Sequence, residues 1–505
     1  MIDAKPYPLS YGWDHKTAVW RGSPCYAKKP PFHPEQSYPE YIMEATGDEP
    51  NHAYDGVREC LRLLGLDRER YGTSEWNPLK GIVKRGDKVV VKPNFVLSRH
   101  SRGGDLFSII THPSVLRAVI DYVYKALEGE GSIIIADAPQ MDCNFQELMK
   151  ATQLAGIQEL YSRKFSFQVE IRDLRDFWLD LQPGDTAAYS TRRFPLPGDP
   201  MGSVLIDLSK QSAFHGKDNW KSFYGADYTR QETIAHHQGE VQQYVVSKTA
   251  LDADVFISVP KLKVHKKVGV TLNAKGLVGI VTNKNCLVHY TLGTPEKGGD
   301  QFPPNLLLGR EEFLVKSQRL LYDALLSKRD PFLDKVYHVI ARAYKKILQP
   351  ARWGVSPDKR ILDAGNWYGN DSAWRMVVDL MRIILFADRE GRICKAPQRR
   401  IFSFVDGIIG GENDGPLSPD AVASGVVVAG ANLLAVDIVG TMLMGLHFSK
   451  LKWITYLLES RLFGICSERD IEVVSSVPDL SEILETGAGL MRFRPHPGWK
   501  GHLDT

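Results

Sequence analysis

Short apolar runs alternate with amphipathic stretches along most of the chain. Residues 88–92, 133–137 and 255–259 are rich in Val and Ile, which is typical of buried strands. Between the first two runs, residues 114–127 carry Val or Leu at every fourth position, the spacing of an amphipathic helix. Strand, helix and strand in this order predict a βαβ unit, in which the two strands are parallel.

The same alternation continues in the second half of the chain. Residues 402–405 and 426–429 are predicted strands, whereas residues 373–387 and a segment beginning near Leu433 are predicted helices. We therefore expect an α/β fold with a mostly parallel sheet or sheets flanked by helices.

Three segments interrupt this pattern. Residues 1–50 are rich in Pro, Tyr and Trp and show no periodicity, so we expect an arm that lies over the surface of a core. Residues 165–245 mix polar and aromatic residues, and residues 303–350 are helical and basic, so both are interpreted as insertions. The predicted domains are an N-terminal arm and helix (1–80), a first α/β half (81–300) with the insertion near 165–245, a helical insertion (301–355) and a second α/β half (356–505).

Composition and charge narrow the function classes. The 505 residues are 43% hydrophobic and 24% charged, ordinary globular values, and the net charge is +3. A nearly balanced charge argues against a general nucleic-acid binder. No run of about eighteen apolar residues occurs, so we expect no transmembrane segment, and no apolar stretch follows a basic start. The expected location is the cytoplasm, and homo-oligomerisation stays open.

The cysteines do not form a metal-binding motif. All six lie far apart, at Cys25, Cys60, Cys143, Cys286, Cys394 and Cys466. Because no C-x-x-C pair is present, the chain carries no intrinsic iron–sulfur motif.

A basic cluster follows the third apolar run. Pro260 ends that run, and Lys261, Lys263 and His265 then recur at every second position, so an extended backbone would project all three to one side. Open α/β sheets bind ligands at the carboxyl ends of their strands. An exposed sheet edge covered by lysines fits the same residues.

Residues 273–279, Asn-Ala-Lys-Gly-Leu-Val-Gly, add to this cluster. The small residues would let a helix N-terminus face an anion, and Lys275 brings another positive charge. Lys263, His265 and Lys275 are therefore the predicted catalytic residues, since an imidazole with fixed positive charge suits a carboxylate or phosphate substrate.

Further polar residues follow predicted strands or precede predicted helices. Asp137, at the end of its strand, is either a helix cap or a carboxylate of the site. The predicted substrate-binding residues are Lys92, Asn94, His112, Lys261, Asn273, Asn366 and Asn370.

The segment 406–416 contains three acidic residues and four glycines after an apolar run. Glycines allow close approach of the backbone to a ligand, and carboxylate oxygens bind divalent cations. Asp406, Glu412 and Asp414 are therefore predicted ligands of a divalent metal. A tight turn after a strand fits the same residues.

Several of these motifs, taken in order, resemble the family called domain of unknown function 362. The resemblance rests on Val-Lys92-Pro-Asn94, Thr111-His112-Pro, the segments 253–265 and 273–279, and the segment from Val405 to Pro416. It covers residues 85–290 and 355–450. It implies an α/β protein; some members carry a ferredoxin-like cluster module, which this chain lacks because its cysteines are not grouped.

A fainter resemblance extends to the N-terminal half of the nickel-pincer lactate racemases. Lys248, Asp254, His265 and Gly276 follow a similar order. The resemblance implies His265 as a metal ligand and Lys248 as an attachment point for a cofactor. The chain departs from the racemases where Asn273-Ala-Lys275-Gly276 replaces their Gly-Gly turn.

These patterns lead to three functional hypotheses. The first is a cytoplasmic enzyme of a biosynthetic pathway that binds a small anionic substrate or cofactor with its Lys/His cluster and acidic glycine-rich segment. The second is an isomerase that depends on a metal cofactor. The third is a non-catalytic carrier or assembly protein for a cofactor.

Overall fold

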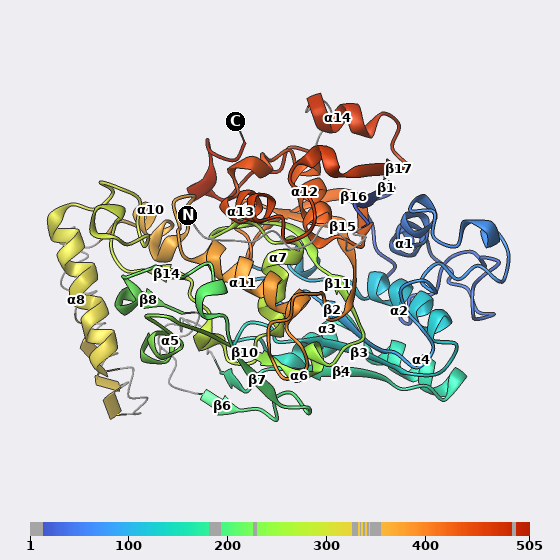
Figure 1. Cartoon of the computed structure of the whole chain (residues 1–505), viewed down its shortest axis with the longest axis horizontal. Coiled ribbons are helices and arrows are strands. Elements are labelled where there is room, and N and C mark those ends of the chain that lie inside the picture. Colours follow the sequence, from blue (N-terminus) through green and yellow to red (C-terminus); the bar gives the residue numbers. More distant parts are fainter. Residues whose placement is uncertain are drawn as a thin grey trace.

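The computed structural model describes residues 14–180, 193–225, 230–325, 355–486 and 491–504, together with seven residues between 332 and 343. Within these residues the architecture is a large mixed sheet flanked by helices on both faces (Figure 1). The predicted α/β class is confirmed.

The centre of the sheet is parallel. Five neighbouring strands run in the order β4 (Val169–Asp173), β3 (Ser132–Asp137), β2 (Lys88–Pro93), β11 (Val255–Val259) and β15 (Arg400–Glu412). Beyond them, β16 (Asp420–Gly430) is antiparallel to β15, and β1 (Lys16–Arg21) and β17 (Glu472–Ser475) complete that side. The short strands β12 (Lys261–His265) and β13 (Gly269–Val270) extend from β15.

Alternate residues of the central strands enter two different cores. Val89 and Val91 pack with α1 (His52–Leu63), α2 (Pro113–Leu127) and α4 (Ala155–Phe165). Val90, on the opposite face, packs with α7 (Leu272–Gly276), α11 (Ala373–Phe386) and α12 (Leu433–Leu443). Because both faces are covered, the strands are apolar at nearly every position.

The predicted βαβ unit is present. β2 and β3 are parallel neighbours, and α2 connects them along the chain. His112 is the N-cap of α2, where its side chain accepts a hydrogen bond from the Ser114 amide. The helices and strands predicted in this region differ from the observed ones by at most about two residues at their ends, as expected for strongly patterned segments.

The sequence predicts an arm without regular structure, but the arm contains the strand β1 (Lys16–Arg21). β1 pairs with β16 and, in parallel, with β17. Thr17, Ala18 and Val19 are its only buried residues, and three consecutive buried residues are too few to show a strand periodicity.

The acidic glycine-rich segment is also not a loop through most of its length. β15 continues to Glu412 and stays paired with β16, with an irregularity between Gly407 and Ile409. A Cβ on Gly411 would lie 2.6 Å from the carbonyl oxygen of Ser108, so this glycine serves close packing.

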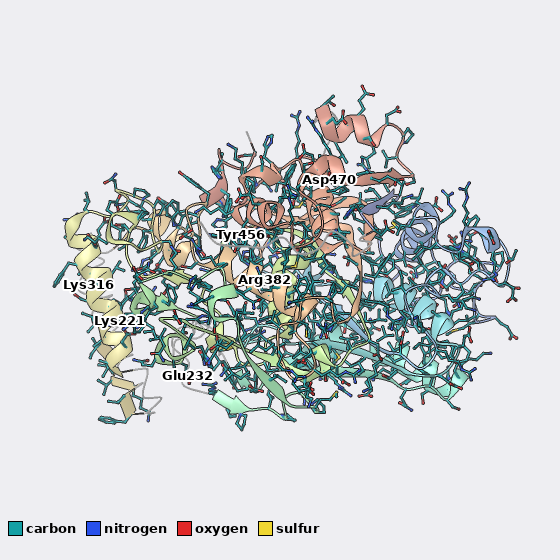
Figure 2. The ribbon with its side chains drawn as sticks, viewed as in Figure 1. Lys221, Glu232, Lys316, Arg382, Tyr456 and Asp470 are labelled. Atoms are coloured by element: carbon teal, nitrogen blue, oxygen red, sulfur yellow. The ribbon has the colours of Figure 1, made fainter. Side chains whose placement is uncertain are left out.

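The insertion predicted at residues 165–245 lies only partly beside the main sheet, because its strand β4 (Val169–Asp173) pairs with β3 and belongs to that sheet. In the same insertion, β7 (Ser203–Asp207) pairs with β10 (Val241–Ser247). In the second insertion, α8 (Gly309–Leu325) lies at the periphery, where Lys316 is exposed (Figure 2); most of residues 326–354 lie outside the described residues. No helix among the described residues has the length and apolar character needed to cross a membrane.

Candidate functional site

A cavity of about 390 Å³ lies at the carboxyl ends of β2, β3 and β12. Its wall comes from Asn94 after β2, from residues 137–142 after β3, and from residues 263–290. Ala364 and Asn366 close another side. The cavity therefore has the position at which open α/β sheets bind ligands.

Two of the three residues of the basic cluster reach the cavity. Lys263 and His265 line it, whereas Lys261 does not. The pairing of β12 with β15 is irregular: Lys261 is opposite Asp406, but Lys263 is opposite Gly411. Lys261 pairs with Asp406 and donates to the Tyr26 hydroxyl, so its ammonium group is held outside the cavity.

Five lysines line the cavity: Lys263, Lys266, Lys267, Lys275 and Lys284. Three of their ammonium groups donate only to neutral carbonyl oxygens. Lys263 Nζ donates to Ile109 O at 2.6 Å, Lys284 Nζ donates to Val278 O at 2.6 Å, and Lys267 Nζ donates to Ala364 O. A carbonyl dipole satisfies a donor but does not neutralise a charge, so the positive charge of each lysine in its protonated form has no anionic partner in these contacts.

Burial changes the protonation of these lysines. It lowers the pKa of Lys267, Lys275 and Lys284 to about 7 each. Burial also lowers the pKa of Lys263 well below its ordinary value, and the charges of Lys261 and Lys275 act in the same direction. A bound anion would favour the charged form of each lysine, and the charged lysines would in turn stabilise the bound anion.

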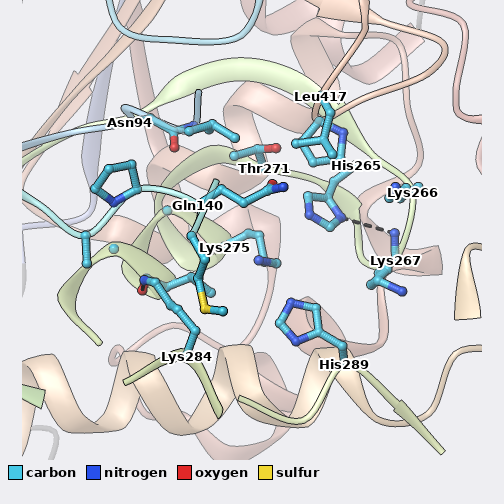
Figure 3. A pocket seen from close by; sticks show the side chains of 18 of the residues that line it. Asn94, Gln140, His265, Lys266, Lys267, Thr271, Lys275, Lys284, His289 and Leu417 are labelled. Carbon is cyan, nitrogen blue, oxygen red and sulfur yellow. Dashed lines mark hydrogen bonds between the residues drawn. The ribbon is translucent and has the colours of Figure 1, made fainter. Parts of the chain in front are cut away.

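Two histidines, His265 and His289, line the cavity (Figure 3), and their Nδ1 atoms have opposite hydrogen-bonding roles. His265 Nδ1 accepts a hydrogen bond from the Lys267 amide at 3.1 Å, so a neutral ring carries its proton on Nε2. His289 Nδ1 lies 2.9 Å from Leu287 O and donates to it, so a neutral ring has its lone pair on Nε2. Burial, followed by the charge of Lys275, lowers the pKa of both rings well below the usual value.

Several buried polar atoms at the cavity have no hydrogen-bond partner among the described residues. They are Asn94 Nδ2, Thr271 Oγ1, Asn366 Oδ1 and the Oδ1 atoms of Asp137 and Asp142, although Asp137 Oδ1 forms an ion pair with Lys92. An unsatisfied buried polar atom costs about 1–3 kcal/mol, so the neutral groups among them point to a polar ligand that completes their hydrogen bonds.

Behind the cavity wall, Lys92 and Asp137 form a buried ion pair of 3.0 Å. Asp137 also accepts from the Phe95 amide at 2.7 Å, and it lines the cavity. A Cβ on Gly279 would lie 1.7 Å from Asp137 Oδ1 and 2.5 Å from Lys92 Nζ. Glycine is thus required at this position for the ion pair to form.

Of the predicted substrate-binding residues, Asn94 and Asn366 line the cavity, whereas Lys92 only supports its wall. His112 lies elsewhere: its ring stacks on Tyr26 with centroids 3.9 Å apart. Lys261 pairs with Asp406 at 3.0 Å, and both side chains are fully buried.

Asn273 and Asn370 do not line the cavity and instead form hydrogen bonds at the N-termini of α7 and α11. The Asn273 amide and side chain both donate to Asp437, which occupies the N-terminus of α7. Asn370 Oδ1 accepts from the Ser372 and Ala373 amides and so caps α11. The predicted anion-binding helix N-terminus therefore already holds a carboxylate of the chain itself.

The three predicted metal ligands are not brought together. Asp406 accepts from the Tyr26 hydroxyl at 2.6 Å and pairs with Lys261. Glu412 pairs with Arg494 at 2.7 Å, and Asp414 pairs with Arg102. Within the described part of the chain, no group of three or more His, Cys, Asp or Glu side chains could hold a metal ion.

The sequence analysis missed several cavity residues: Lys266, Lys267, Thr271, Lys284 and His289. Lys266 and Lys267 directly follow His265 and could have been included with the cluster. Lys284 and His289 lie in a segment without helical or strand periodicity, so no pattern indicated their place in the fold.

The fold and the site define an α/β protein with a cationic cavity at the carboxyl edge of its sheet. The family described as domain of unknown function (DUF362) matches residues 89–189 and 214–442, so the chain belongs to that family. The comparisons with curated proteins and with solved structures each gave no match. The two matched segments contain all the cavity residues described above.

Proposed function

We propose that the protein is an enzyme that binds a small anionic substrate or cofactor, a carboxylate or a phosphate, in this cavity. The observation that carries the proposal is the charge of the wall: five lysines line it, against the two carboxylates of Asp137 and Asp142. Asp137 is already paired with Lys92. Buried charges are stable when they are paired, and an anionic ligand supplies that partner here.

The histidines give the proposed enzyme its acid/base groups. His265 Nε2–H can donate a hydrogen bond to the ligand, and His289 Nε2 can accept a proton from it. Both rings are neutral near pH 7 because their pKa values are lowered. Their different tautomers then make one ring a donor and the other an acceptor toward the ligand. A role in a cytoplasmic biosynthetic pathway remains part of this proposal.

Anion binding is tested by calorimetry and by thermal unfolding at pH near 7, with inorganic phosphate, oxalate and citrate as probes. We expect saturable binding and a stabilisation that grows with the logarithm of the anion concentration. Lys275→Met should weaken the binding of the best probe about tenfold, the effect of losing one favourable charge interaction. Lys316→Met, an exposed change on α8, is the matched control.

Two results would count against the proposal. One is that none of the probes binds the wild-type protein. The other is that Lys275→Met and Lys316→Met bind the best probe equally well. Native mass spectrometry of the purified protein would identify any anion that is retained.

A further inference from the structure

Lys275 differs from the other lysines at the cavity in its lack of partners. Its ammonium group has no hydrogen bond and no ion pair among the described residues, whereas Lys263, Lys267 and Lys284 each donate to a carbonyl oxygen. Lys266 also lacks such a contact, but the negative charge of Asp414 acts on it. Among the described residues, no carboxylate is one of the influences on the pKa of Lys275.

Lys275 is also close to the other ionisable groups of the cavity. Its charge is among the influences on five of them: Lys263, His265, Lys267, Lys284 and His289. In the view of Figure 3, its side chain lies between Gln140 and Lys284. The unpartnered amine of Lys275 is therefore surrounded by lysines, which can bind an anion, and by histidines, which can transfer protons.

We infer that Lys275 is a nucleophile that forms an imine with the oxo group of a 2-oxo acid bound in the cavity. The inference rests on the anion binding proposed above and adds the class of substrate to it. Three requirements of such an amine are met: it lines the cavity, it has no hydrogen-bond or ion-pair partner among the described residues, and burial, followed by the charge of Lys92, lowers its pKa to about 7, so that part of its population is uncharged.

A 2-oxo acid fits because its two functional groups are adjacent. The cations around Lys275 bind the carboxylate, and this binding places the neighbouring oxo carbon beside the amine. An anion whose charge lies far from its carbonyl would draw the reactive carbon away from Lys275.

The step is balanced without an oxidant or a reductant. The lone pair of the neutral Lys275 amine forms a bond to the oxo carbon, and the carbonyl π electrons move to oxygen, which takes a proton. That proton comes from the added nitrogen by way of His289 Nε2, which is a suitable acceptor and donor. The second proton of the nitrogen follows the same route to the hydroxyl, which leaves as water as the carbon–nitrogen double bond forms, so one amine and one carbonyl give one imine and one water.

The test is reductive trapping of wild-type protein at pH near 7 with 2-oxoglutarate or pyruvate and cyanoborohydride. We expect one adduct per chain, heavier by the mass of the oxo acid less one oxygen atom, and peptide mapping should place it on Lys275. Malonate, a dianion without an oxo group, should bind and protect the amine. Lys316→Met should be trapped to the same extent as wild type, since Lys316 is exposed on α8.

Lys275→Arg separates charge from nucleophilicity. This variant keeps a cation at the position but cannot form the imine, so it should still bind malonate and should give at least tenfold less adduct. Mapping of the wild-type adduct does not depend on how any variant folds.

The outcomes are distinct. If wild type binds malonate but gives no adduct, or gives one on Lys263, Lys267 or Lys284, the inference about Lys275 is overturned and anion binding still stands. If wild type binds neither malonate nor an oxo acid, the proposed function fails, and the inference fails with it.

Discussion

The cavity lysines couple ligand binding to pH. Lys267, Lys275 and Lys284, with pKa values lowered to about 7, are partly neutral in the free protein near that pH. An anion favours their charged forms, so binding draws protons from the solvent. Affinity is therefore a property of the protonation state as much as of the shape of the cavity.

We expect the affinity for oxalate to fall as pH rises through about 7, because the lysines of the free protein lose their protons. The loss is at most about tenfold per pH unit for each lysine that must be protonated on binding. Calorimetry in buffers of different ionisation enthalpy would detect proton uptake at pH near 8. An affinity that stays constant from about pH 6 to about pH 8.5 would contradict this assignment.

Gly279 is a second residue whose effect can be isolated. Gly279→Ala would place a Cβ against the Lys92–Asp137 pair and force it apart. Breaking a buried pair costs about 3–5 kcal/mol, so we expect a loss of that order in the free energy of unfolding, measured with denaturant. Gly276→Ala is the control, since the nearest atom to its Cβ, Pro260 Cβ, is 3.8 Å away; equal effects of the two changes would refute the steric argument.

At the scale of elements, β15 links the arm to the sheet through one carboxylate. Asp406, in the middle of β15, accepts from Tyr26 in the arm, from Lys261 in β12 and from the His112 amide at the start of α2. Four segments far apart in sequence thus meet at a buried cluster outside the cavity. This arrangement explains an acidic residue in the middle of a buried strand without a metal.

Asp406→Asn should leave the fully buried Lys261 without its charged partner. We expect a loss of about 3–5 kcal/mol in the free energy of unfolding, because removing one partner of a buried pair leaves an uncompensated charge. Glu412→Gln, which affects an ion pair with the largely exposed Arg494, should cost at most about 1 kcal/mol. Oxalate binding by both folded variants should equal that of wild type. A tenfold loss of affinity in either variant would show that the substituted acid belongs to the binding site after all.

The helices and strands could be predicted wherever buried apolar residues recur at a regular spacing along the chain. The apolar runs of β2, β3 and β11 and the fourfold spacing of α2 follow directly from packing on two faces of a sheet. The length of β15 was not predictable in this way. Its second half contains glycines and acids whose partners, Ser108, Tyr26 and Arg494, are distant in sequence.

The residues of the candidate site likewise fall into those that the sequence could predict and those that depend on the fold. Lys263, His265 and Lys275 could be found because they follow a predicted strand and lie near each other in the chain. The roles of Asp406 and Lys261 depend on a pairing between β12 and β15 that only the fold determines. The contribution of His289 depends on the course of a short connection between a 3₁₀ turn (Lys284–Cys286) and β14 (Tyr290–Thr291), whose sequence shows no periodicity.

At the scale of the whole molecule, one sheet gathers strands from both ends of the described chain. β1 is hydrogen-bonded between β16 and β17, although it precedes them by about 400 residues. The arm therefore contributes to the central architecture as well as to the surface. Its removal would expose an edge of β16 and leave β17 without the strand it pairs with.

Truncation tests this dependence. A chain beginning at Ala27 lacks both β1 and Tyr26, whereas a chain beginning at Asp14 keeps them. We expect the shorter chain to unfold at lower temperature than Asp406→Asn and to associate through the exposed strand edge, as judged by light scattering. Equal stability of the two truncated chains would show that β1 is dispensable.

β11 and β12 follow one another along β15, first opposite residues 400–403 and then opposite Asp406 and Gly411. The buried framework thus positions Lys263 and His265, while the succeeding residues 266–290 supply most of the remaining polar wall from outside the central strands. Substitutions at the polar positions of this stretch that line the cavity would change which molecule is bound, whereas its apolar residues pack in the core and would have to be kept. Relatives that share the rigid part can consequently be expected to differ in what they bind, and chimaeras that exchange only that stretch would reveal how far selectivity is portable.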